Sequence, residues 1–117
     1  MIIPTNLAIA FACPHCGRIV YRTFSLFQLK KGEDLEVGCV CGRHPCAIGL
    51  DQERMMYVLL WGKCCDDPHE FYFYLDELRE DALLGLACDA AVLGLGFLGS
   101  PRMVKLAAED CRLPTPL

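Results

Sequence analysis

Two closely spaced pairs of cysteines in the first half of the sequence have the form of a metal site. Cys13 and Cys16 make a Cys-x-x-Cys motif followed by glycine, and Cys39 and Cys41 make a shorter pair that is also followed by glycine. Two thiolates from one tight turn can reach a single ion, and the glycine tolerates the backbone conformation that closes the turn. Four soft ligands of this kind suit tetrahedral Zn²⁺ and, less often, iron. Since four thiolates leave no position for water or substrate, the sequence predicts a structural zinc site.

Other residues keep the choice of ligands open. Cys46 follows the second pair closely and could replace Cys39 as a ligand. Cys64 and Cys65 lie in a predicted loop, with His69 just beyond it. If the predicted strands alternate in direction, this loop returns to the same end of the sheet as both cysteine pairs. These residues could then supply a fourth ligand, or form a second site with Cys46.

The motifs CPHCG and CVCG, together with the segment between them, resemble the zinc-ribbon or rubredoxin-like class over residues 11–42. The first motif is also similar to that of the small bacterial CpXC group, which has Cys-Pro-x-Cys where this sequence has CVCG. The zinc-ribbon resemblance implies a metal-stabilised binding module and names no particular ligand. On this basis we expect a non-catalytic zinc module that mediates interaction with a protein or a nucleic acid.

An alternative function is thiol chemistry, in which a redox or metal-responsive protein uses the adjacent Cys64 and Cys65. Adjacent cysteines do not easily form an unstrained disulfide, but they can bind soft metals, and His69 could help to deprotonate them. The neighbouring Asp66 and Asp67 oppose this chemistry, because like charges disfavour the thiolate. The sequence contains no phosphate-binding glycine loop with lysine and no His-Glu-x-x-His motif, so an enzyme is the less favoured expectation.

The cysteine content indicates a reducing compartment. Nine cysteines in 117 residues, an odd number with two close pairs near glycine, fit metal ligation better than a secreted disulfide framework. The apolar residues before Cys13 resemble a lipoprotein signal, but they lack a positively charged start and contain Pro4. We therefore predict a cytoplasmic protein.

Charge is distributed unevenly along the chain. Residues 1–50 carry five Lys or Arg and three Asp or Glu, whereas residues 51–117 carry six and twelve. The excess of basic residues in the first half is small beside that of a nucleic-acid-binding protein, so a protein partner is favoured. The cations of the first half that could contact phosphates are expected to form an ordinary solvated face; they are Arg18, Arg22, Lys30 and Lys31.

The pattern of apolar and β-branched residues predicts an α+β fold, in which a zinc-ribbon-like antiparallel meander of about five strands precedes two helices. A turn at residues 30–34 is expected to join the first two strands as a hairpin and so bring both cysteine pairs to one end of the sheet. The predicted strands cover residues 18–29, 34–39, 46–51, 55–61 and 69–75.

The remaining sequence predicts helices over residues 76–98 and from Pro101 to about Arg112. The first is acidic at its start and apolar nearly all round in its second half, and the second begins with Ser100 as a cap before proline. The apolar part is shorter than a comfortable membrane span, so we expect it to pack on the sheet or on a second copy in a homodimer. The chain is thus divided into a sheet region, 1–75, and a helical region, 76–117, within one domain.

Overall fold

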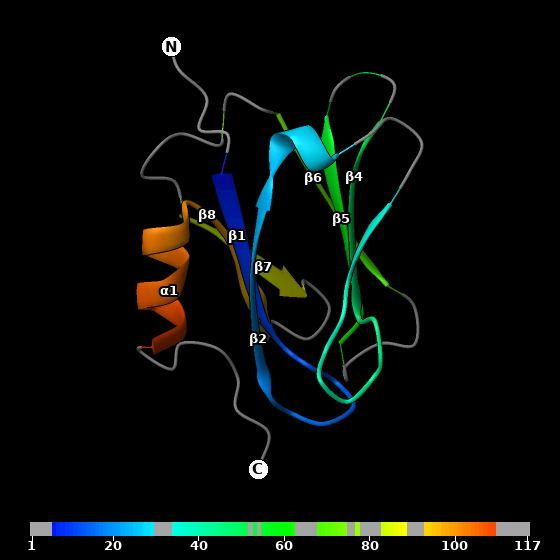
Figure 1. Cartoon of the computed structure of the whole chain (residues 1–117), viewed down its shortest axis with the longest axis vertical. Coiled ribbons are helices and arrows are strands. Elements are labelled where there is room, and N and C mark those ends of the chain that lie inside the picture. The colour runs from blue at the N-terminus through cyan, green and yellow to red at the C-terminus, as the bar shows by residue number, and fades with distance from the viewer. Residues whose placement is uncertain are drawn as a thin grey trace.

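Two antiparallel β-sheets and one α-helix make up the described part of the chain (Figure 1). The computed structural model describes residues 6–29, 34–51, 53, 55–62, 68–74, 77, 83–88 and 93–109. The elements are β1 (Asn6–Ala12), β2 (Ile19–Ser25), the 3-10 turn η1 (Leu26–Gln28), β3 (Leu35–Val37), β4 (Cys46–Leu50), β5 (Met56–Leu60), β6 (His69–Phe73), β7 (Leu83–Cys88), β8 (Leu93–Gly99) and α1 (Pro101–Glu109).

The molecule has three layers. The first sheet has the strand order β2-β1-β8-β7, and the second has the order β3-β4-β5-β6. The main hydrophobic core lies between the two sheets and takes large side chains from both, such as Phe11 of β1 and Ile48 of β4. Helix α1 covers the other face of the first sheet, as Figure 1 shows, and places the buried Val104 against alanines of β1.

Strand β1 is buried on both faces, which explains why the alternation of polar and apolar residues failed to reveal it. Its large residues Leu7, Ile9 and Phe11 point into the core between the sheets. Its small residues Ala8 and Ala10 point towards α1, where a larger side chain would hold the helix away. The alternation in this strand is therefore one of size rather than polarity.

The predicted fold class is wrong, because the described residues contain eight strands and a single α-helix. All five predicted strands are present as β2 to β6, and the second predicted helix is present as α1. Where a helix was predicted over residues 76–98, the chain forms β7 and most of β8, and residues 75–76, 78–82 and 89–92 lie outside the described part. The homodimer was predicted to form through that helix, but the described residues of this region are strands instead.

An irregularity in the pairing of β7 with β8 changes which side chains of β8 face the core. Leu86 pairs with Gly96 but Ala87 pairs with Gly94, so Leu95 is an extra residue in β8. Such a bulge reverses which side chains face the core beyond it. Leu95 and Leu98 consequently both lie in the core although they are three residues apart, a spacing typical of a helix.

The predicted hairpin between the first two predicted strands is also wrong. Strand β2 belongs to the first sheet and β3 to the second, so the chain crosses from one sheet to the other between them. Strand β8, from the region predicted to be helical, lies between β1 and β7 in the first sheet. Within the described residues, no helix is long and apolar enough to span a membrane.

The close approach of β8 to β1 gives a test of this arrangement. A Cβ atom at Gly96 would overlap the carbonyl oxygen of Ala10 and lie 3.0 Å from the Cβ of Phe11. We expect Gly96→Ala to lower the free energy of unfolding by about 2 kcal/mol, the usual cost of overpacking a core. Urea denaturation measures this change. In the matched control Gly85→Ala, the new Cβ meets nothing within 4 Å, so a comparable loss of stability there would contradict the arrangement.

Candidate metal centre

The first cysteine pair lies in the tight connection between β1 and β2, which we call the first knuckle (residues 13–18). The Cys13 N–H donates to the carbonyl oxygen of Arg18 at 2.9 Å, and the Gly17 N–H donates to the carbonyl oxygen of Cys13 at 2.9 Å. Gly17 has a φ of 82°, in the left-handed region that glycine adopts at little cost. These bonds close the turn with both thiols in it.

The second cysteine pair lies between β3 and β4, in the second knuckle (residues 39–43). The Cys39 N–H donates to the carbonyl oxygen of Arg43 at 2.8 Å, and the Gly42 N–H donates to the carbonyl oxygen of Cys39 at 3.0 Å. Gly42 has a φ of 92°. The second knuckle is therefore one residue shorter than the first but is closed by the same two bonds and the same glycine conformation.

The four thiols converge on one point. The Sγ atoms of Cys13 and Cys41 lie 3.8 Å apart, and those of Cys16 and Cys39 lie 3.3 Å apart. All four sulfur atoms lie within 4.8 Å of one another. A tetrahedron of sulfur atoms about 2.3 Å from a central ion has edges of about 3.8 Å. The four cysteines could therefore bind a metal ion.

One thiol of each pair belongs to the hydrophobic core and the other faces solvent. Cys13 and Cys39 are buried, whereas Cys16 and Cys41 are exposed. Cys13 continues the series of core-facing residues of β1, and Cys39 follows Val37 of β3 in the same way. Since side chains alternate along a strand, each buried thiol is the next core position of the strand that leads to it.

Backbone and thiol hydrogen bonds set the acidity of the cluster. The Cys41 N–H donates to the Cys39 sulfur and is the main cause that lowers the pKa of Cys39 to about 7. At Cys16 the backbone hydrogen bond from Arg18 lowers the pKa, but the thiol hydrogen bonds with Cys39 and its neighbours, together with desolvation, raise it to about 11. One thiol thus ionises readily while another keeps its proton.

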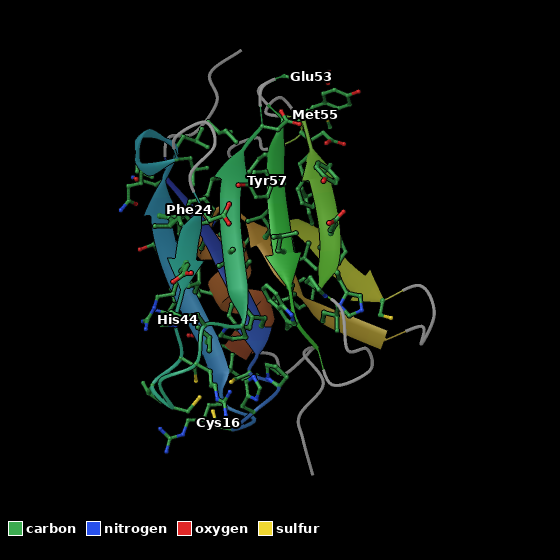
Figure 2. All side chains as sticks on the ribbon, turned by 90° about the vertical axis from the view of Figure 1, so that its right-hand side faces the viewer. Cys16, Phe24, His44, Glu53, Met55 and Tyr57 are labelled. Carbon is green, nitrogen blue, oxygen red and sulfur yellow. The ribbon has the colours of Figure 1, made fainter. Side chains whose placement is uncertain are left out.

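The cluster links the two sheets of the sandwich. The first knuckle belongs to the first sheet and the second knuckle to the second, and both lie at the same end of the molecule. Figure 2 shows Cys16 and His44 at this end and Glu53 and Met55 at the opposite end. A second link is formed by Arg22 of β2, which donates from its guanidinium to the carbonyl oxygen of Gly38 at 3.3 Å. Sequence reasoning missed this role, because it placed Arg22 on a solvated face.

The alternative ligands lie apart from the cluster or outside the described residues. Cys46 begins β4 and is 1% exposed, and desolvation raises its pKa to about 12, so it remains a protonated core thiol. His69 lies with its Nδ1 3.0 Å from the carbonyl oxygen of Leu60. Because Cys46 pairs with Leu60, and Leu60 with His69, the end of β5 and the start of β6 lie at the end of the second sheet that carries the second knuckle. Cys64 and Cys65 fall outside the described residues.

No family model matches this chain, and no curated protein or solved structure matches it significantly. The geometry of the four thiols is therefore what indicates a metal site, and the resemblance to zinc ribbons stays a prediction based on the two motifs.

Metal binding should depend strongly on pH. Thiolates bind metals and thiols do not, so binding must remove at least the proton that Cys16, with its pKa of about 11, holds near neutrality. We expect the apparent affinity for Zn²⁺ to rise by about tenfold or more per pH unit between about pH 6.5 and about pH 8.5. Competition with a chelator whose own pH dependence is known measures this slope. An affinity that does not change over this range would contradict the assignment of these thiols as ligands.

Proposed function

We propose that this protein is a non-catalytic zinc-binding module in which Cys13, Cys16, Cys39 and Cys41 hold one structural Zn²⁺ ion. The observation that supports this proposal most directly is the convergence of four thiols, within 4.8 Å of one another, from two turns far apart in the sequence. A donor set of four sulfurs favours zinc over the harder metals. Four protein ligands also complete a tetrahedron, which leaves no position for water or substrate.

The ion's role in this proposal is to join the two sheets at one end of the sandwich. Each sheet contributes one knuckle, so the bound ion would act as a crosslink between them. The core between the sheets extends well beyond the knuckles, from Cys13 at one end to Met56 and Leu50 near the other. We therefore expect the ion to stabilise a fold that the core already specifies, unlike a small zinc finger that depends on its metal entirely.

We further propose that the module acts by binding another protein in a reducing compartment. Val40 lies between two ligands of the second knuckle and is 72% exposed, so an apolar side chain stands at the surface beside the metal. A contact of this kind suits a protein surface better than a phosphate backbone. The formal net charge of −4 also opposes association with nucleic acid.

The metal content of the purified protein tests the proposal. Elemental analysis should find one zinc per chain, and replacing any one of the four ligands by serine should remove stoichiometric zinc. Cys46→Ala is the matched control, because Cys46 is a cysteine close to the site but outside the cluster, and it should keep one zinc per chain. Iron in place of zinc, or full zinc content in Cys16→Ser, would refute the proposed site.

Removal of the metal should lower stability without abolishing the fold. A ligand present at 1,000 times its dissociation constant stabilises the native state by about 4 kcal/mol. We therefore expect chelation to reduce the free energy of unfolding by about this amount, while the circular dichroism spectrum keeps its β-sheet signal. Complete loss of that signal on chelation would show that the core does not specify the sandwich without the ion.

A further inference from the structure

A groove runs beside the metal centre, between the open edges of the two sheets. Its larger part holds about 340 Å³ and lies between residues 18–22, which include most of β2, and residues 38–40 of the segment that enters the second knuckle. A smaller hollow of about 130 Å³ continues along β2 and β3 and shares Arg22 and Gly38 with the first. Figure 2 shows the strand that carries Phe24 running along this side of the molecule towards the end marked by Cys16.

The groove is lined by the free edge of a strand. In the first sheet β2 pairs with β1 and stands at the end of the strand order, so among the described strands its other edge has no partner. The edge of a sheet presents backbone N–H and C=O groups in the spacing that an extended chain can match. Proteins use such edges to bind peptides as an added strand.

The side chains around the larger hollow are basic and apolar, whereas the lining of the smaller hollow also includes Glu36. Arg18 and Arg22 line the larger hollow, and none of its described lining residues is acidic. In residues 13–22 and 38–44, which contain both knuckles, there are three arginines and no aspartate or glutamate. Ile19, 40% exposed, and Val40 add apolar surface at the same place. This combination is complementary to a strand whose side chains include carboxylates and small apolar groups.

We propose that the groove binds an extended acidic segment of a partner protein, which adds to the edge of β2. The segment's carboxylates would meet the guanidinium group of Arg18 and those N–H groups of Arg22 that do not donate to Gly38, and its apolar side chains would meet Ile19 and Val40. The inference rests on the proposed function, because the second knuckle that forms one wall of the groove is held in place by the metal.

A peptide fits the groove better than a single-stranded nucleic acid does. Such nucleic acids are bound by aromatic side chains on which the bases stack. Tyr21 is the aromatic residue in the described lining of the larger hollow, and its hydroxyl donates to the carbonyl oxygen of Pro101 at 3.2 Å, which ties it to α1. Phe24, which lines the smaller hollow, is buried. The groove therefore offers a strand edge and cations but, in its described lining, no exposed aromatic side chain on which bases could stack.

The test measures binding of short labelled peptides to the zinc-loaded protein by fluorescence anisotropy. A peptide of about six residues that alternates valine and glutamate should bind saturably, and the same peptide with lysine in place of glutamate should not. Two versions of the glutamate peptide can be methylated at alternate backbone nitrogens, one version for each set. One of the two should not bind, because its methyl groups replace the N–H groups that face β2. Equal binding of both methylated peptides and the parent peptide would overturn addition to the edge.

Substitution of Arg18 locates the site. We expect Arg18→Gln to weaken binding of the glutamate peptide by about tenfold, the usual loss when a charge-assisted hydrogen bond is removed. Arg18 is exposed and its backbone closes the first knuckle, so the variant should keep its fold and its zinc. Arg102→Gln on α1 is the control and should bind the peptide as the unmodified protein does.

The outcomes separate this inference from the proposed function. One zinc per chain with no binding of the glutamate peptide would overturn the docking site and leave the zinc module intact. Absence of zinc would refute the proposed function itself. Tighter binding of an oligothymidylate of about eight nucleotides, lost in Arg18→Gln, would assign the groove to nucleic acid instead and overturn the peptide proposal.

Discussion

The burial of β1 on both faces is the constraint on which the rest of the structure depends. Large side chains on one face of this strand fill the core between the sheets, and alanines on the other face admit α1. The same strand leads into the first knuckle, so the series of core positions that ends at Phe11 continues directly to the Cys13 thiol. Packing of the core and placement of the first buried thiol are therefore consequences of one alternation along one strand.

The four thiols meet because, in the second sheet as in the first, a series of core-facing residues leads to a buried cysteine. Strand β3 carries its core-facing series from Val37 to Cys39, and the two buried thiols are brought together by the packing of the sheets rather than by a shared hairpin. The exposed partners, Cys16 and Cys41, are then placed by the closure of each turn around a left-handed glycine. The cysteine cluster and the groove beside it both lie where the two sheets approach each other, and both depend on the distance between these sheets.

The sequence predicted the cysteine turns and most single strands, but it did not predict which strands pair with one another. The four cysteines and the two glycines act within turns of five or six residues, so their spacing contained the needed information. The strands β2 to β6 were also found, since β6, for example, alternates between core-facing Phe71 and exposed Tyr72. Strands β1, β7 and β8 were missed or mistaken for a helix. Strand β1 is buried on both faces, and β8 contains a bulge, so that Leu95 and Leu98 both face the core although they are three residues apart.

The sequence by itself determined the pairing of the cysteines within each knuckle, the closure of each knuckle and the start of α1 at Pro101, because each of these depends on residues only a few positions apart. Only the tertiary structure decided that β2 and β3 belong to different sheets, that the two knuckles meet, and that a groove remains open beside the cysteine cluster. These features depend on which strands share a sheet. That choice is made by the packing of apolar faces far apart in the chain, whose summed burial outweighs any local preference.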